Sequence, residues 1–163
     1  MTSPLQLLKT QFGYESFRYQ QEEIIQTVLN NQDAFVLMPT GGGKSLCYQL
    51  PALLLNGVTV VVSPLIALMK DQVDALRFNG IAAAFFNSTL SYGEQKIVLE
   101  QLRNRELKLL YIAPEKLFSN GGSFLQVLKN SGVALFAIDE AHCISQWGHD
   151  FRPEYFSLSR LKQ

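Results

Sequence analysis

The chain has 163 residues, of which 47% are hydrophobic, and this length and composition suit one folded domain with a real core. Lysine and arginine together number 14, as do aspartate and glutamate, so no overall charge draws the protein to nucleic acid and any such contact must be local. No apolar run reaches the ~18 residues of a membrane helix, and the N-terminus lacks the basic and apolar regions of a signal peptide, which argues against a membrane protein.

The two cysteines, Cys47 and Cys143, lie far apart and lack the C-x-x-C spacing of a metal site. They are expected to be small buried hydrophobic residues in a reducing compartment such as the cytoplasm.

The N-terminal part of the chain predicts two helices. Ser3 as N-cap, Pro4 at the first helical position and Gln6 three residues after the cap form the pattern of a capping box. The second helix is expected to end near residues 30–31, and its apolar face carries Ile24, Ile25, Val28 and Leu29.

A short β-type run at 34–38 leads into the sequence Met38-Pro39-Thr40-Gly41-Gly42-Gly43-Lys44-Ser45. Successive glycines allow a tight bend with the N–H groups turned inward, and a helix starting near Lys44 would add its positive N-terminal end. The pattern therefore predicts a polyphosphate-binding loop in which Lys44 reaches the β- and γ-phosphates and Ser45 ligates Mg²⁺. Met38 stands where G-x-x-x-x-G-K-[ST] has its first glycine, and the alternative is a simple glycine turn. The expected phosphate-binding residues are Thr40, Gly41, Gly42, Gly43, Lys44 and Ser45.

The middle of the chain predicts two strand–helix pairs. A strand at 58–62 is followed by Ser63-Pro64, which starts a helix. The apolar residues of this helix at helical spacing are Leu65, Leu68, Met69, Val73 and Leu76. A strand at 82–86 is followed by a second capping box, Ser91 with Glu94, which opens a helix running to about Asn104.

Two further strands are expected at 107–112 and 133–138, with a turn at 120–122 between them. Strands that alternate with helices in this way are typical of a parallel sheet with helices on both faces, and near-continuous apolar runs suit strands buried on both sides. The predicted fold class is α/β, in one domain.

The last strand is followed directly by Asp139-Glu140-Ala141-His142. Open α/β sheets bind ligands at the carboxyl ends of their strands, so the two carboxylates are expected to face the phosphate loop. Asp139 suits a direct or water-mediated Mg²⁺ ligand, and Glu140 suits a general base that polarises the attacking water. Adjacent carboxylates also occur at solvated strand ends, but together with the phosphate loop they favour phosphoanhydride hydrolysis. Position alone assigns no chemistry to His142. The expected catalytic residues are Lys44, Asp139 and Glu140.

These segments resemble motifs of superfamily 2 helicases. Asp139–His142 resembles the DEAH form of motif II, and Met38–Ser45 resembles motif I, which in those proteins often lacks the first glycine. The aromatic-rich stretch 143–155 is similar to a loop of RecQ-type DNA helicases, and residues 12–21 resemble motif 0 of that family. The resemblance covers essentially the whole chain.

For motif 0, the resemblance implies that Tyr14 stacks on adenine while Arg18 and Gln21 contact the edge of the base. A planar ring and an amide that both donates and accepts are suited to recognising adenine. The alternative for these residues is ordinary packing at a helix entry.

For the aromatic-rich loop, the resemblance implies DNA binding coupled to hydrolysis. Its aromatic side chains suit stacking on bases, which contributes roughly 1–3 kcal/mol per base, and its basic ones suit phosphate. The expected DNA-binding and coupling residues are Trp147, His149, Phe151 and Arg152, with Tyr155 as a further aromatic. The alternative is that Trp147 and Phe151 pack the domain core.

Two more segments resemble family motifs that lie along the DNA path. Ser63-Pro64-Leu65 with the downstream residues 69–72 resembles motif Ia, although Lys70 also suits a solvated helix position. Tyr111–Glu115 resembles a further motif, in which Pro114 ends a strand and opens a helix.

The resemblance implies that residues 1–163 form the first RecA-like, P-loop NTPase lobe of a 3′→5′ DNA helicase that uses ATP and Mg²⁺. It implies DNA as partner, single-stranded or at duplex junctions, in the cytoplasm of a bacterium or the nucleus of a eukaryote, in repair and recombination. The chain is expected to stop before the motif III strand and to lack the second RecA-like lobe, so the sheet would be incomplete at its C-terminal end and marginally stable alone. The alternatives are a nucleotide- and DNA-binding module without autonomous turnover, or a P-loop small-molecule kinase, for which no arginine-bearing lid is evident.

Overall fold

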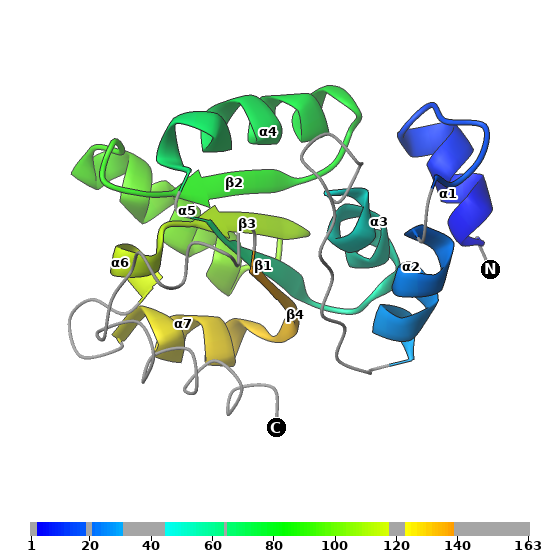
Figure 1. Cartoon of the computed structure of the whole chain (residues 1–163). Coiled ribbons are helices and arrows are strands. Elements are labelled where there is room, and N and C mark those ends of the chain that lie inside the picture. Colours follow the sequence, from blue (N-terminus) through cyan, green and yellow to red (C-terminus); the bar gives the residue numbers. More distant parts are fainter. Residues whose placement is uncertain (1–2, 19–20, 31–44, 64, 118–122, 139–163) are drawn as a thin grey trace. The chain divides into compact units, whose positions relative to one another are not determined.

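The computed structural model describes residues 3–18, 21–30, 45–63, 65–117 and 123–138 (Figure 1). They belong to two compact units, one within residues 1–56 and the other within residues 57–163. Within the described ranges, no helix is both long and apolar enough to span a membrane.

The first unit contains three helices, α1 (Pro4–Gln11), α2 (Gln21–Leu29) and α3 (Leu46–Leu54). The predicted capping box opens α1: the Ser3 N–H donates to Gln6 Oε1 (3.0 Å) and the Gln6 N–H donates to Ser3 Oγ (3.2 Å). The apolar faces of the three helices meet in a cluster in which each fully buried leucine or isoleucine contributes about 1.5–3 kcal/mol. The buried members are Leu8, Ile25, Leu46 and Leu50, and the partly buried ones are Leu7, Phe12, Phe17, Leu29 and Leu54.

The second unit is built on a four-stranded parallel sheet. Its strands are β1 (Val58–Val62), β2 (Ala83–Phe86), β3 (Leu109–Ile112) and β4 (Val133–Ile138), in the order β2-β3-β1-β4. The prediction of a parallel α/β sheet is confirmed, with β1 and β4 at the predicted residues. The predicted strand at 34–38 and the turn at 120–122 lie outside the described residues.

Two strands begin later than the apolar pattern predicts, at Ala83 rather than 82 and at Leu109 rather than 107. The N–H of Lys108 donates to the carbonyl of Ala82 (2.8 Å). The residues just before β3 and β2 are thus already hydrogen-bonded to each other before the regular pairing of the two strands starts. Leu107 is buried and Ala82 is exposed, so apolar content marks burial at the first of these two positions only, and each strand begins where its ladder of hydrogen bonds does.

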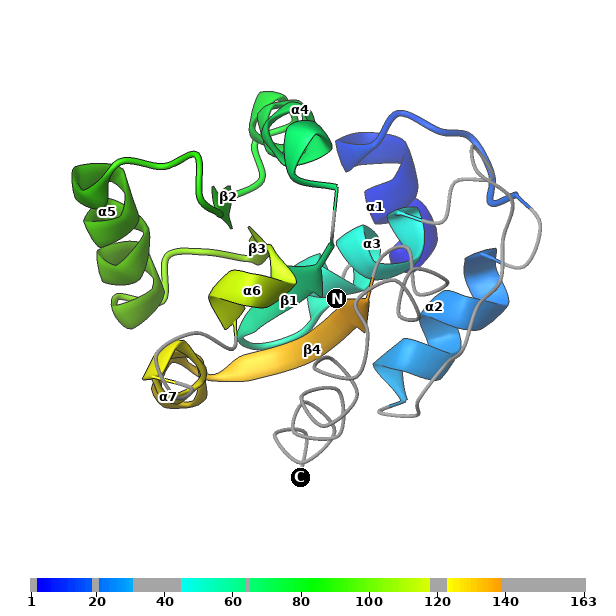
Figure 2. The ribbon, with the colours of Figure 1, turned by 60° about the vertical axis from the view of Figure 1, so that its left-hand side comes forward.

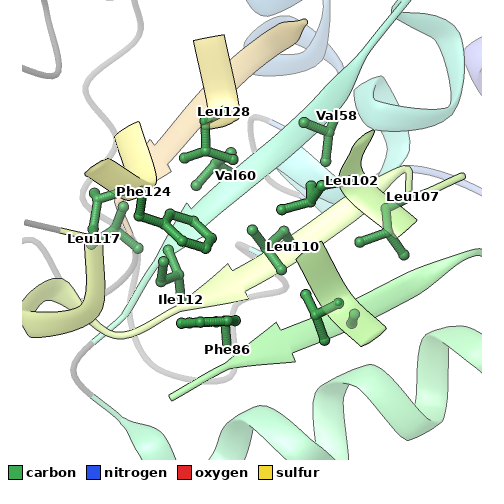
Figure 3. Close-up of a cluster of buried hydrophobic side chains, with 13 residues drawn as sticks. Val58, Val60, Phe86, Leu102, Leu107, Leu110, Ile112, Leu117, Phe124 and Leu128 are labelled. Atoms are coloured by element: carbon green, nitrogen blue, oxygen red, sulfur yellow. The ribbon is translucent and has the colours of Figure 1, made fainter. Parts of the chain in front are cut away.

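Helices cover both faces of the sheet, as Figure 2 shows for α4 (Ile66–Phe78) on one side and α5 (Tyr92–Arg103), α6 (Pro114–Leu117) and α7 (Ser123–Ser131) on the other. Side chains alternate along a strand, so Val58, Val60 and Val62 all enter the cluster on the α5–α7 side. In that cluster the rings of Phe86 and Phe124 lie 4.7 Å apart, centre to centre, at a tilt of 41°. Figure 3 shows how the strands and helices contribute to it.

The helix α4 differs from its prediction at its first turn. It begins at Ile66, after Leu65, because Ser63 Oγ accepts a hydrogen bond from the Leu65 N–H (3.2 Å) in a turn of its own. Met69, Val73 and Leu76 are buried, but Leu65 and Leu68 are exposed, at 38% and 48%. Helical spacing identified the helix correctly, but of the apolar residues at its start only Met69 is buried.

The helix α5 begins as predicted. Ser91 is its N-cap, the Ser91 N–H donates to Glu94 Oε1 (2.8 Å) and the Glu94 N–H donates to Ser91 Oγ (3.2 Å). These bonds from the Ser91 backbone and side chain lower the pKa of Glu94 below its usual range. The predicted end near Asn104 is also confirmed, since Asn104 is the C-cap.

Candidate functional site

Four of the predicted nucleotide-binding residues lie in the described part of the chain: Tyr14, Arg18, Gln21 and Ser45. The others lie outside it, together with the acidic pair and the aromatic-rich loop, and their roles stay predictions. They are Thr40, Gly41, Gly42, Gly43, Lys44, Asp139, Glu140, Trp147, His149, Phe151 and Arg152.

Tyr14 follows α1 at a sharp turn. Gly13 has a φ of +76°, a conformation that glycine adopts at little cost, and the Tyr14 N–H donates to the carbonyl of Leu8 (3.1 Å). The turn therefore fixes the backbone of Tyr14 against the end of the helix. Its ring remains 52% exposed, with an aromatic face accessible to a planar partner.

Gln21 and Arg18 form a closed turn at the start of α2. The Arg18 N–H donates to Gln21 Oε1 (2.8 Å), and the Gln21 N–H donates to the Arg18 carbonyl (3.0 Å). Gln21 is 3% exposed, so its carboxamide is held in one orientation, with the oxygen towards the Arg18 backbone. Gln21 therefore has a structural role in closing this turn, which its position as the first residue of α2 indicates. It is also a candidate for base recognition.

Ser45 is the N-cap residue of α3. Its carbonyl accepts bonds from the N–H groups of Tyr48 (3.2 Å) and Gln49 (2.9 Å), so the helix begins where the phosphate-loop pattern predicts. A serine at this position usually caps with its hydroxyl, but here φ is −58° and ψ is −36°, and the hydroxyl makes no capping bond. Because the Ser45 hydroxyl makes no capping bond to the helix, it suits the predicted role of a metal ligand.

The carboxyl ends of β1, β2 and β3 lie level at one edge of the sheet. The N–H of Ser63 donates to the Ile112 carbonyl (3.1 Å), and the N–H of Ala113 donates to the Phe86 carbonyl (3.3 Å). Ser63, 1% exposed, therefore joins the end of β1 to that of β3. Pro114 opens α6 directly after β3, as predicted.

Asn87 is a residue at this edge that the motifs did not single out. It comes directly after β2, is 1% exposed, and its side chain bonds to both Thr89 and Met69. The sequence feature that could have identified Asn87 is its position as a polar residue immediately after a buried strand.

Lys70 projects from α4 and forms an exposed ion pair with Asp74, with Nζ 2.8 Å from Oδ2. The hydrogen bond and the charge of Asp74 raise the pKa of Lys70. The structure gives Lys70 the environment of a solvated helix residue with a carboxylate partner one turn away. Exposed pairs of this kind contribute little to stability and exchange partners readily.

Cys47 is buried in α3, which confirms its prediction as a small hydrophobic residue, while Cys143 lies outside the described residues. Burial raises the pKa of the Cys47 thiol to about 11, so the side chain stays protonated at neutral pH. Within the described ranges, no group of three or more His, Cys, Asp or Glu residues is placed to hold a metal ion.

Comparison with known proteins places these features in a family. A model described as DEAD/DEAH box helicase matches residues 18–163. The chain is 59% identical over 158 residues to a protein of Haemophilus influenzae named ATP-dependent DNA helicase RecQ, a match covering 97% of this chain and 25% of that protein. A Bacillus subtilis protein of the same name is 54% identical, over 95% of this chain and 26% of its own length.

The similarity extends to eukaryotes. A Caenorhabditis elegans protein named RecQ-like DNA helicase blm-1 is 47% identical over 96% of this chain and 16% of its own length. The chain thus spans about a quarter or less of the length of these relatives. The predicted resemblance to RecQ-type proteins is confirmed over nearly the whole chain.

Proposed function

We propose that this chain, which belongs to the DEAD/DEAH box helicase family, forms the ATP-binding motor lobe of a RecQ-type 3′→5′ DNA helicase. The observation that carries the proposal is the high identity, over nearly the whole chain, to proteins named ATP-dependent DNA helicases. The parallel sheet, with a helix starting directly after the Lys44-Ser45 pair, is the scaffold that such a lobe requires.

In this proposal Tyr14 stacks on the adenine, and Arg18 and Gln21 contact its edge. Gln21 is 3% exposed and its Oε1 already accepts a bond from the Arg18 N–H (2.8 Å), so the turn supports the assignment by holding the Arg18 backbone in one position, from which the Arg18 side chain contacts the base. The exposed Tyr14 ring supplies the flat surface.

The phosphates are bound by the loop Thr40–Ser45. Backbone N–H groups of Gly41, Gly42 and Gly43 surround them, and Lys44 neutralises charge on the β- and γ-phosphates. Ser45 and Asp139 would hold Mg²⁺, which supplies charge neutralisation at the phosphates when bound, and the Ser45 hydroxyl, uncommitted to helix capping, fits that role. Glu140 accepts a proton from the attacking water as general base.

DNA is the proposed second ligand, and the aromatic-rich loop is its sensor. Trp147 and Phe151 stack on bases of a single strand or a duplex junction, while His149 and Arg152 pair with phosphates. Since the loop follows Glu140 within a few residues, its movement on DNA repositions the general base and couples DNA binding to hydrolysis. The protein acts where DNA is, in the bacterial cytoplasm or the eukaryotic nucleus.

A second RecA-like lobe is the proposed partner that completes the site. In related phosphoryl transfer an arginine finger contributes about 10³–10⁵ in rate, so a lobe without one binds ATP far better than it turns it over. This supports the second candidate function, that residues 1–163 alone are a nucleotide- and DNA-binding module.

The test is the ATPase rate of the full-length protein with and without single-stranded DNA. We expect DNA-stimulated turnover that Lys44→Ala abolishes, while Lys129→Ala, an exposed lysine on α7, leaves it unchanged. Turnover that survives Lys44→Ala would refute the phosphate-loop assignment, and turnover indifferent to DNA would refute the helicase proposal. DNA-stimulated turnover by residues 1–163 alone would exclude the binding-module candidate.

A further inference from the structure

We draw no further inference here: the strongest candidate, the exposed apolar stripe of Leu68, Ala75 and Phe78 along α4, carries nothing because nothing in the structure shows what covers it.

Discussion

A Cβ atom added to Gly57 would lie 2.6 Å from the carbonyl oxygen of Gly132. The same oxygen accepts a bond from the Val58 N–H (3.1 Å), so this approach brings β1 and β4 together at their amino ends. Gly57 also has a φ of +114°, a region that residues with a side chain rarely adopt.

Gly57→Ala is therefore expected to destabilise the protein by about 2–4 kcal/mol, from backbone strain and from the clash with a main-chain atom that cannot give way. Gly93→Ala is the matched control: Gly93 lies in α5 with nothing within 4 Å of its added Cβ, and alanine there should stabilise by about 0.5–1 kcal/mol. Urea unfolding measures both. Equal changes in the free energy of unfolding for the two variants would show that the close approach of Gly132 does not exclude a side chain at position 57.

Two helices end in the same Schellman motif with different residues at the left-handed position. After α4 the residue is Gly80, with bonds from Gly80 N–H to Arg77 (2.9 Å) and from Ile81 N–H to Leu76 (3.0 Å). After α5 the residue is Arg105, with a φ of +57° and the corresponding bonds from Arg105 and Glu106.

Arg105→Gly should stabilise the protein by about 0.5–1 kcal/mol, because glycine adopts the left-handed conformation without the Cβ penalty. Gly80→Ala should destabilise it by about 1 kcal/mol for the converse reason. Thermal unfolding of the two variants provides the comparison. A loss of stability in Arg105→Gly would mean that the arginine side chain, which lies near Gly132, contributes more than the strain costs.

Thr59, the second residue of β1, is fully buried, and within the described residues its hydroxyl has no hydrogen-bond partner. Thr59→Val replaces the hydroxyl with a methyl group of similar size and should stabilise by about 1 kcal/mol, since an unsatisfied buried polar group is removed. Thr59→Ser, which keeps the hydroxyl and loses the methyl, should destabilise. Chemical unfolding distinguishes the two signs, and destabilisation by valine would reveal a partner for the hydroxyl.

The raised pKa of Cys47 makes stability depend on pH. The thiol titrates at 9.0 when unfolded and at about 11 when folded, so between these values the unfolded state loses a proton that the folded state keeps. Its contribution to stability is constant below pH 9 and declines as the pH rises towards 11. In a Cys143→Ser background, Cys47→Ala should reduce the fall in urea midpoint over this range. An unchanged slope would contradict the burial of the thiol.

Trp147 is predicted to couple DNA to hydrolysis. In the full-length protein, Trp147→Ala should weaken DNA-stimulated ATPase and unwinding at least tenfold, from the loss of about 1–3 kcal/mol of base stacking and of the coupling itself. Basal ATPase without DNA, and the melting temperature, separate this from a packing role. The proposal is wrong if DNA stimulation of the ATPase and unwinding are both intact in Trp147→Ala. It is also wrong if the variant's only change is a large fall in melting temperature.

The sequence by itself determined the features whose causes are local. Five such features are confirmed, and each depends on residues within about one turn or one strand: the capping boxes at Ser3 and Ser91, the start of α3 after the glycine-rich loop, and the apolar runs of β1 and β4. The phosphate loop, Asp139-Glu140 and the aromatic-rich loop are motifs of the same local kind, and their roles remain predictions.

Only the tertiary structure decided what depends on residues distant in the chain. The order β2-β3-β1-β4, the exposure of Leu65 and Leu68 on an otherwise buried face, and the bond from Asn87 to Met69 have no local signal. A pattern fixes which side of a helix is apolar, but which turn the sheet covers depends on strand lengths and register. Likewise, the sequence indicates only a turn glycine at Gly57. The close approach of Gly132 to it is visible only in the tertiary structure, because it depends on packing between residues distant in the chain.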